Sequence, residues 1–504
     1  MEETTIFYSF VSLLLLILAF KLLLPKARYK NTPPSPPSLP IIGHLHLLKQ
    51  PLHRTLHKLS LKYGPIISLW IGSRLVIVAS SPSIVEECFT KNDVVLANRP
   101  KLLIGKHVNY NHTTIGDEPY GDHWRNLRRI AATELLSTHR LNMLVGIRRE
   151  EIKRLLQRLS RDSCNEFAKV ELKSLFMELA FNIMVRMVAG KRYYGEDVTN
   201  EEEASEFREM MTEIEFYGGV SYSGDFLPIL KWIDLGGYEK KIIKLGKKVD
   251  AILQGLIDEK RSKKEDIESQ NTMVDHLLSF QESQPEYYTD QIIKGIVLVM
   301  LIAGTETTAV TLEWTMSNLV NHPDILNKAR AELDTHVGEE RLVDEADLSK
   351  LPYLQNIISE SHRIYPAAPL SVPHMSSDDC RIGGYDVPRD TMLIVNAWAI
   401  HRDPNLWDDS DSFKPERFES GQVEANKLMP FGLGRRACPG EGLTQRMLGL
   451  TLGLLIQCFQ WKRVSEKEVD MTETQGLTMP KAIPLEVMCK ARPIMNNKVL
   501  CEDI

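Results

Sequence analysis

The sequence predicts a mainly helical protein with a small β-sheet, preceded by an apolar N-terminal segment. Its 504 residues are 43% hydrophobic and 25% charged, which is close to the average globular composition. Most periodic stretches repeat apolar residues at helical spacing, whereas two regions combine β-branched runs with turn residues. One apolar run near the N-terminus has membrane-spanning length. These observations favour a large helical body behind an anchor.

The N-terminal apolar run covers residues 6–24 and is interrupted by Lys21. A hydrocarbon core of ~30 Å needs about 20 apolar residues, so the run is long enough to cross it once. Two glutamates precede the run and basic residues follow it. This order is the reverse of a cleaved signal peptide and favours a cytoplasmic C-terminal side. We expect residues 1–30 to form an anchor that spans the bilayer or, because of Lys21, lies at its surface.

Residues 31–46 contain the proline-rich stretch PPSPPSLPIIGHLH. Prolines restrict φ and favour an extended, semi-rigid linker. We therefore expect a hinge between the anchor and the rest of the chain, which would hold the body at a restricted angle to the membrane.

Strands are expected in two distant regions. Residues 66–79 carry β-branched runs around Gly72 and Ser73, and residues 380–395 repeat the pattern around further glycine- and proline-containing turns. Such runs on either side of a short turn are typical of hairpins. We expect the two regions to contribute to one small sheet.

Helices are expected over most of the remaining body, from the spacing of apolar residues and from capping residues. The predicted helical segments are residues 122–137, 150–160, 175–189, 205–216, 238–262, 289–321, 323–336, 354–365 and 441–460. The apolar run 296–304 is too short to cross a membrane and lies between Lys294 and Glu306. We expect a buried core helix there.

The charge and the cysteine pattern exclude several functions. With 61 Lys and Arg against 67 Asp and Glu, the formal net charge is -6, so the chain lacks the global basic field of a nucleic-acid-binding protein. The seven cysteines are scattered and form no Cys-x-x-Cys pair. This argues against a disulfide framework or a zinc ribbon and indicates a reducing compartment.

The sharpest local feature is the stretch FGLGRRACPG at residues 431–440, which is followed by a long apolar helix. Cys438 sits near a helix N-terminus, where free N–H groups and the helix dipole favour a thiolate that can ligate a metal. Gly440 allows close approach of the backbone to a flat partner, Phe431 can shield the sulfur, and Arg436 offers a cation to a carboxylate. Taken alone, Cys438 could also be an inert buried thiol.

The pattern Phe431-x-x-Gly434-x-Arg436-x-Cys438-x-Gly440 resembles the haem-binding loop of the cytochrome P450 monooxygenases. The resemblance implies the cytochrome P450 fold, a haem b cofactor and Cys438 as the axial ligand of the haem iron. A thiolate ligand pushes electron density to the iron and favours O–O cleavage.

A polar segment, AGTETT, interrupts the apolar helix at residues 303–308. The Thr307 hydroxyl can bond the i−4 carbonyl of Ala303 and open the helix beside a cofactor. The same segment could instead produce a simple helix kink or a groove for packing. The resemblance assigns Glu306 and Thr307 to proton delivery during dioxygen activation, so both are candidate catalytic residues.

Charged residues further along the chain predict a structural network. Glu360 and Arg363 lie at i and i+3 on one helix face, a spacing that alone is typical of an exposed ion pair. The resemblance implies a buried network of these two residues with Arg417, and losing one member of such a network costs a few kcal/mol.

Three further residues complete the predicted cofactor site. Trp124 and Arg128 lie at i and i+4 on a helix, and the resemblance implies that they contact a haem propionate. His374 occupies the position of a third propionate donor, although an ordinary strand histidine would fit the sequence as well.

Within the family, residues 112–130, 187–197 and 224–230 resemble the plant group with isoflavone hydroxylases and lignan methylenedioxy-bridge synthases. Segments that face the pocket in this family are mainly apolar here, which suits a lipophilic substrate, although core packing explains them equally well. The candidate pocket residues are Phe216, Tyr217, Ala303, Leu370 and Val372.

The resemblance implies a haem-thiolate monooxygenase that uses O2 to hydroxylate, or oxidatively ring-close, a flavonoid or isoflavonoid, a lignan or a terpenoid. No stretch remains for a flavin or nicotinamide domain, so electrons from NADPH would come through a membrane-bound NADPH–cytochrome P450 reductase. Because the motifs must meet at one cofactor, we expect a single catalytic domain at residues 47–504. It would face the cytosol from a single-pass anchor in the endoplasmic reticulum membrane.

Three alternatives remain at this point. The first is an enzyme of the same fold that isomerises or dehydrates hydroperoxides without O2. The second is a haem sensor or haem carrier, for which Glu306 and Thr307 would be unnecessary. The third is a membrane scaffold without haem.

Overall fold

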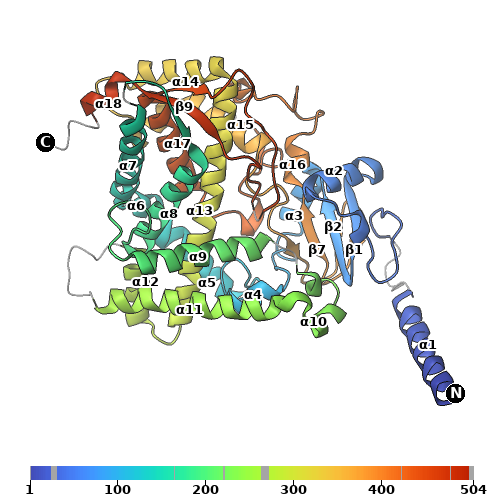
Figure 1. Cartoon of the computed structure of the whole chain (residues 1–504). Helices are drawn as coiled ribbons and strands as arrows, with labels where there is room; N and C mark the ends of the chain where they lie inside the picture. Colours follow the sequence, from blue (N-terminus) through green and yellow to red (C-terminus); the bar gives the residue numbers. More distant parts are fainter. Residues whose placement is uncertain are drawn as a thin grey trace. The chain divides into compact units, whose positions relative to one another are not determined.

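The computed structural model describes residues 2–23, 31–163, 165–219, 222–262, 272–421, 423–476 and 478–498 (Figure 1). The chain divides into two compact units. The first unit comprises Met1–Pro100, Tyr222–Tyr238 and Leu370–Ala399. The second unit comprises Lys101–Ser221, Glu239–Pro369 and Ile400–Ile504.

The first unit is built around a four-stranded sheet with the order β1-β2-β7-β4. Its strands are β1 (Ile66–Ile71), β2 (Arg74–Ala79), β7 (Met392–Val395) and β4 (His374–Met375). β2 and β7 run parallel, while the other two pairs are antiparallel. The predicted hairpin is therefore confirmed, and the distant region joins the same sheet through β7.

The rest of that distant region forms its own hairpin, because β5 (Cys380–Ile382) pairs only with β6 (Tyr385–Val387) among the described strands. The turn between β1 and β2 needs glycine for two reasons. Gly72 has φ +57°, and a Cβ there would lie 2.2 Å from the carbonyl oxygen of Phe226.

One face of the larger sheet forms the core of the first unit. Leu56 packs there against Ile67, Leu69, Val76 and other buried strand residues. The helical segments that begin in this unit are α1 (Glu2–Leu23), η1 (Leu45–Leu47), α2 (Leu52–Tyr63), α3 (Pro82–Phe89), η3 (Ser223–Asp225), α10 (Ile229–Ile233), η4 (Leu235–Gly237) and α16 (Ala397–His401).

The N-terminal segment is helical, as the sequence predicts, and its side chains from Ile6 to Leu16 are mostly exposed. By length and apolar composition, the one helix in the described part of the chain that could cross a membrane is α13 (Asp290–Asn321); Ile6–Leu16 is a shorter apolar stretch. Residues 24–30 of the predicted anchor lie outside the described residues.

The second unit is mainly helical. Its helices and helical turns are α4 (Leu103–His107), α5 (Asp122–Arg129), η2 (Ile130–Leu135), α6 (Thr138–Met143), α7 (Val145–Ser163), α8 (Leu172–Ala189), α9 (Glu201–Gly219), α11 (Tyr238–Ser262), α12 (Met273–Ser283), α13, α14 (Pro323–His336), η6 (Glu345–Lys350), α15 (Pro352–Ile364), η7 (Pro415–Phe418), η8 (Gly434–Arg436), α17 (Glu441–Cys458) and α18 (Pro493–Lys498). All the predicted helical segments are found, most with shifted ends. In the segment 122–137, α5 continues into a π-helix, η2.

A second sheet lies in this unit, and the sequence analysis missed it. Its order is β3-β9-β8, with β3 (Ala168–Glu171), β9 (Glu486–Ala491) and β8 (Phe459–Arg463). The strands are short, and two of them adjoin long helices, so they carry little periodicity of their own.

The long helix α13 forms the centre of the second unit (Figure 1). It packs against α8, α15 and α17. Most of its side chains are buried, and the buried ones lie on every face of the helix. A helix that is apolar all round is typical of a core, so the predicted buried core helix is confirmed. At Gly304, α13 approaches α8 so closely that a Cβ on this residue would lie 2.6 Å from the sulfur of Met184.

Candidate active site

The loop that carries Cys438 folds back on itself before α17. The Cys438 N–H donates to the Phe431 carbonyl at 2.8 Å, and Gly432 and Gly434 adopt φ values of +71° and +69° that favour glycine. The Gly440 N–H then donates to the Cys438 sulfur at 3.3 Å. The sulfur is thus held at the first turn of a helix, as the sequence predicts.

The surroundings of Cys438 act on its thiol in opposite directions. The atoms packed around it raise the pKa of the thiol, whereas the N–H groups of Gly440 and Glu441 and the charge of Arg128 offset part of that rise. The side chain as a whole is exposed. A sulfur with N–H donors and a cation beside it suits a thiolate bound to a metal.

Three of the predicted propionate and loop residues contact the loop of Cys438 or one another. Arg128 donates to the carbonyl of Ala437 at 2.5 Å. The Arg436 guanidinium lies 4.3 Å from the centre of the Trp124 ring. Trp124 and Arg436 both donate to the carbonyl of Ile115, each at 3.1 Å. A sulfur with two guanidinium groups nearby fits a flat anionic iron cofactor with carboxylate groups, whereas the indole N–H of Trp124 is already bonded to Ile115.

His374 lies in β4 of the first unit. It is buried, its Nδ1 lies 2.8 Å from the carbonyl oxygen of Leu96, and its ring packs at 4.9 Å from Phe89. Leu370 packs against the core of the same unit, whereas Val372 is exposed. The structure therefore places these three predicted residues in a different unit from Cys438.

The polar segment of α13 is held by two kinds of hydrogen bond. The Thr307 hydroxyl donates to the Ala303 carbonyl at 2.7 Å, as the sequence predicts, but α13 remains continuous there and the predicted opening is not observed. Glu306 Oε1 accepts a hydrogen bond from the Thr478 hydroxyl at 2.7 Å. Glu306 Oε2 is buried and has no hydrogen-bond partner among the described residues.

Burial raises the pKa of Glu306, although the hydrogen bond from Thr478 and the charge of Lys173 lower it in part. Glu215 on α9 faces the same acid, and burial together with the charge of Glu306 raises its pKa to about 7. The sequence does not connect Glu215 or Thr478 with Glu306, because neither shares a local motif with it.

The remaining pocket candidates lie on α9 and α13. The rings of Phe216 and Tyr217 meet edge to face at 5.1 Å, and Phe216 is exposed. Ala303 is also exposed on α13.

The three residues of the predicted ion network are in contact, and the Glu360–Arg363 pair within it is fully buried. Arg363 donates to both oxygens of Glu360, at 2.7 and 2.8 Å, and both side chains have zero exposure. Arg417 Nε and the Lys414 backbone N–H also donate to Glu360 Oε1, at 3.2 and 2.8 Å. Further Arg363 N–H groups bind backbone carbonyls. Every charge in this network therefore has a partner.

His362, next to this pair, is buried against the ring of Phe431 at 5.2 Å. Neither of its ring nitrogens has a hydrogen-bond partner among the described residues. Burial lowers its pKa from 6.5 to about 4, so the ring is neutral at physiological pH.

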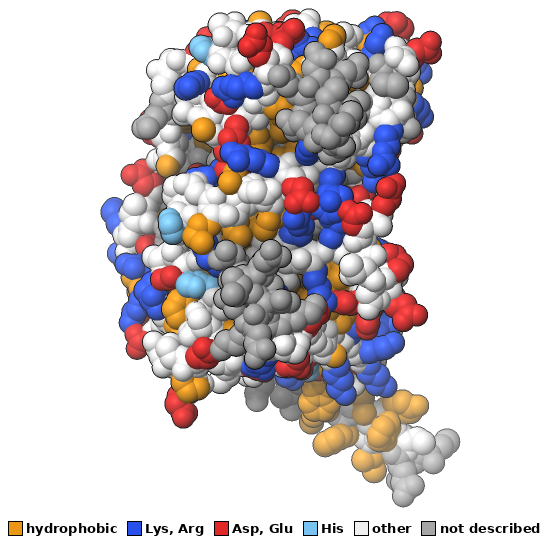
Figure 2. Space-filling model, turned by 90° about the vertical axis from the view of Figure 1, so that its left-hand side faces the viewer, with side chains coloured by type: hydrophobic (Ala, Val, Ile, Leu, Met, Phe, Trp, Pro, Cys, Tyr) orange, Lys and Arg blue, Asp and Glu red, His pale blue; other side chains and the backbone are white. Residues whose placement is uncertain are grey.

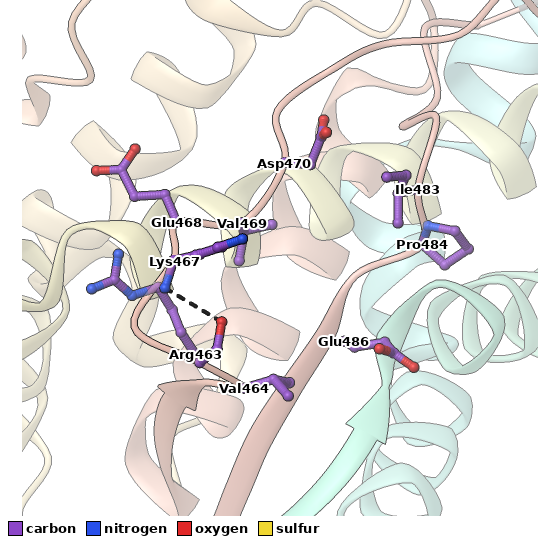
Figure 3. Close-up of a pocket in the computed structure, with 10 residues that line it drawn as sticks. Arg463, Val464, Lys467, Glu468, Val469, Asp470, Ile483, Pro484 and Glu486 are labelled. Carbon is purple, nitrogen blue, oxygen red and sulfur yellow. Dashed lines mark hydrogen bonds between the residues drawn. The ribbon is translucent and has the colours of Figure 1, made fainter.

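A space-filling view and a close-up of one pocket bear on other candidate sites. Figure 2 shows acidic and basic side chains interspersed over one face, without a large field of one sign. Figure 3 shows a pocket beside β8 and β9 with Arg463, Lys467, Glu468 and Asp470 in its lining. No predicted site residue lines this pocket.

Comparisons with known proteins show the family to which the chain is similar. The family "Cytochrome P450" matches residues 33–487. Cytochrome P450 81E8 of Medicago truncatula is 58% identical to this chain and covers 98% of it and 100% of its own length. Isoflavone 2'-hydroxylase of Glycyrrhiza echinata is 55% identical, covering 99% of each chain. (+)-Piperitol/(+)-sesamin synthase of Sesamum radiatum is 52% identical, covering 98% of each.

A solved structure shares the fold. A zebrafish cytochrome P450 with abiraterone superposes with a TM-score of 0.74 at 26% identity, covering 88% of this chain and 99% of that chain. The similarity therefore spans nearly the whole chain in sequence and most of it in structure.

Proposed function

The chain belongs to the cytochrome P450 family, and we propose that it oxidises a lipophilic plant specialised metabolite, such as a flavonoid or isoflavonoid, a lignan or a terpenoid. Members of this family are haem-containing monooxygenases that receive electrons from a reductase. An isoflavone hydroxylase and a sesamin synthase are both more than half identical to the chain. Their names support hydroxylation or oxidative ring closure as the reaction.

Cys438 is the proposed axial ligand of the haem iron. Trp124, Arg128 and Arg436 are the proposed partners of the haem propionates, with His374 as a further partner. When bound, the haem supplies the iron centre at which O2 is reduced with electrons from NADPH, so that one oxygen atom enters the substrate and the other leaves as water. The donors around the Cys438 sulfur are the observation that carries the proposal.

Glu306 and Thr307 are the proposed proton donors. Burial favours the neutral form of Glu306, so its carboxyl group can hold a proton. The bond from the Thr307 hydroxyl to the Ala303 carbonyl fixes the direction of that hydroxyl on an open side of α13. The proposed roles are to hold a proton at Glu306 and to orient its transfer through Thr307.

The reduced, CO-bound difference spectrum tests the ligand. We expect a Soret band near ~450 nm for thiolate ligation in the wild type and loss of that band in Cys438→Ser. The matched control is Cys458→Ser, which changes a buried thiol of the same unit. Folded wild-type protein without this band would contradict the assignment of Cys438.

Reconstitution with a reductase tests the substrate class. Membranes that contain the protein and a NADPH–cytochrome P450 reductase are incubated with flavonoids, isoflavonoids, lignans and terpenoids, and the products are analysed by mass spectrometry. A gain of one oxygen identifies hydroxylation, whereas loss of two hydrogens identifies ring closure. Product formed from a hydroperoxide without O2 or NADPH would point instead to an isomerase or dehydratase.

Residues 1–30 are the proposed single-pass anchor in the endoplasmic reticulum membrane, residues 31–46 the hinge, and residues 47–504 one catalytic domain in the cytosol. The exposed apolar side chains of α1 support the anchor. Carbonate extraction of membranes tests the anchor. The full chain should stay with the membrane, and a chain lacking residues 1–30 should be released. A truncated chain that stays in the carbonate-washed membrane would contradict the proposal.

A further inference from the structure

The segment of residues 478–485 binds two acidic side chains of α13. The Thr478 hydroxyl donates to Glu306 Oε1 at 2.7 Å, and the Leu485 N–H donates to Glu313 Oε1 at 2.9 Å. Glu306 and Glu313 are seven residues apart, which is about two turns of an α-helix. Both acids therefore lie on one face of α13, and this segment runs along that face.

Other contacts fix the segment independently of Thr478. The Trp314 indole donates to the Met479 carbonyl at 2.7 Å, and the Met479 N–H donates to the Ala367 carbonyl at 3.1 Å. The buried Lys481 ammonium lies 4.6 Å from the centre of the Trp314 ring. Since the backbone on the C-terminal side of Thr478 is held at several points, the position of its hydroxyl is defined by the fold.

This hydroxyl distinguishes the two oxygens of Glu306. Oε1 accepts the hydrogen bond, while Oε2 is buried without a partner among the described residues. A neutral carboxyl group has one carbonyl oxygen and one O–H group. With a donor already bound at Oε1, the carboxyl proton is placed on Oε2, where no acceptor in the described part of the chain competes for it.

We propose that Thr478 is a positioning residue for Glu306: its hydroxyl holds Oε1 as the carbonyl oxygen and leaves the transferable proton on Oε2. This inference rests on the proposed role of Glu306 as a proton donor.

Two other charged groups face Glu306 and act on its titration. Lys173 of α8 lowers the pKa of Glu306, whereas Glu215 of α9 is a second acid beside it. Thr478 also lowers the pKa of Glu306 through its hydrogen bond. Removing the Thr478 hydroxyl should therefore move the titration of Glu306 to higher pH, while Lys173 and Glu215 stay in place.

Infrared spectroscopy of the full-length haem protein tests the inference without substrate. The carbonyl stretching band of protonated Glu306 is assigned by its loss in Glu306→Gln. In Thr478→Val we expect this band to shift to higher frequency, because the hydrogen bond to Oε1 is lost, and to titrate at higher pH. Thr478→Ser keeps a hydroxyl and should restore both properties. Thr474→Val, the same change at an exposed residue four positions before Thr478, should alter neither.

Activity gives a second readout on the substrate that the wild type converts. We expect the product formed per NADPH oxidised to fall about 5-fold in Thr478→Val, as for loss of one hydrogen bond, and to recover in Thr478→Ser. The reduced CO spectrum reports whether each variant folds with haem. Thr478→Ala replaces Thr478→Val if the valine variant does not fold.

The outcomes separate this inference from the proposed function. A Thr478→Val protein with the wild-type band and titration overturns the role of Thr478, even if Glu306→Gln loses product formation. A Thr478→Ser protein that behaves like Thr478→Val overturns it as well. If Glu306→Gln forms product with wild-type efficiency, the proton-donor role of Glu306 fails and the inference fails with it.

Discussion

Glu360 and Glu306 lie in the same unit, one on α15 and the other on α13, and their carboxyl groups have different partners. Glu360 is completely buried and accepts hydrogen bonds from Arg363, Arg417 and a backbone N–H. Glu306 accepts one hydrogen bond from an uncharged hydroxyl, and its Oε2 has no partner among the described residues.

The difference separates a structural acid from an acid available for chemistry. Glu360 forms ion pairs with two guanidinium groups, and its removal would leave those cations without a counter-charge. Burial beside one hydroxyl favours the neutral form of Glu306, which can release a proton. The same residue type in one unit thus serves two purposes, and its partners determine which.

The largest effect is expected from breaking the Glu360 network. Glu360→Gln keeps the shape of the side chain but leaves Arg363 uncompensated, and it should lower the free energy of unfolding by about 3 to 5 kcal/mol. The matched control is Glu416→Gln, whose ion pair with Lys328 is half-exposed and should contribute less than about 1 kcal/mol. Denaturant unfolding measures both. Equal effects of the two substitutions would show that the buried network adds no special stability.

Glu306→Gln should preserve the fold and impair the chemistry. We expect product formation to fall about 100-fold, a typical contribution of a positioned acid, with an unfolding midpoint close to that of the wild type. Turnover with added reductase and the reduced CO spectrum provide the two measurements. A stability loss as large as that of Glu360→Gln would remove the distinction drawn between the two acids.

Thr307→Ala tests the hydroxyl one residue after Glu306. Product formed per NADPH oxidised should fall about 10-fold, in line with one hydrogen bond of ~1.4 kcal/mol, and Thr307→Ser should recover it. Thr311→Ala makes the same change one turn further along α13, where the hydroxyl bonds the Thr307 carbonyl. If the Thr311 variant is equally impaired, the effect belongs to the helix rather than to Thr307.

The two regions should also respond to pH in opposite directions. Glu215, beside Glu306, has its pKa raised from 4.5 to about 7, so the folded protein binds this proton more tightly than the unfolded chain. Its contribution to the free energy of unfolding therefore decreases as the pH rises through that interval. Glu215→Gln should flatten the measured stability between these pH values. An unchanged slope would contradict the burial of this acid.

His362, beside Glu360, should give the smallest effect and the opposite sign. Its pKa is lowered from 6.5 to about 4, so the unfolded chain takes up the proton first and stability decreases as the pH falls through that interval. His362→Leu removes the titrating ring and, with it, two buried ring nitrogens that have no hydrogen-bond partner among the described residues. At pH 5 we expect a higher denaturation midpoint than for the wild type, and at pH 8 a smaller difference. A lower midpoint at pH 5 would show that the ring contributes more by packing on Phe431.

Local patterns in the sequence predict much of the fold and part of the site. Residues 238–262 and 323–336 match α11 and α14 because each has its own apolar face and boundary residues. Cys438 can be identified because its glycines, arginine and phenylalanine lie within ten residues of sequence. For these elements, the residues that determine the structure are neighbours in the sequence.

The missed features depend on contacts between distant segments. The hydrogen bond from Thr478 to Glu306 joins residues 172 positions apart, and no spacing rule connects them. β3 pairs with β9 across a still larger separation, with Ala168 opposite Cys489, and neither strand has a distinctive pattern. The half-buried state of Glu215 arises in the same way, since this residue of α9 comes close to Glu306 of α13 only in the folded unit.

The parallel pairing of β2 with β7 bears on the order in which the protein is made. Val76 pairs with Met392, so the ribosome must synthesise nearly all of the intervening chain before this sheet can be completed. At roughly 5 to 20 residues per second, this interval is on the order of tens of seconds. During this interval, the edge of β2 that later pairs with β7 has no partner strand. The nascent chain therefore carries an unpaired strand edge for much of its synthesis, and factors that shield such edges should raise the yield of folded protein.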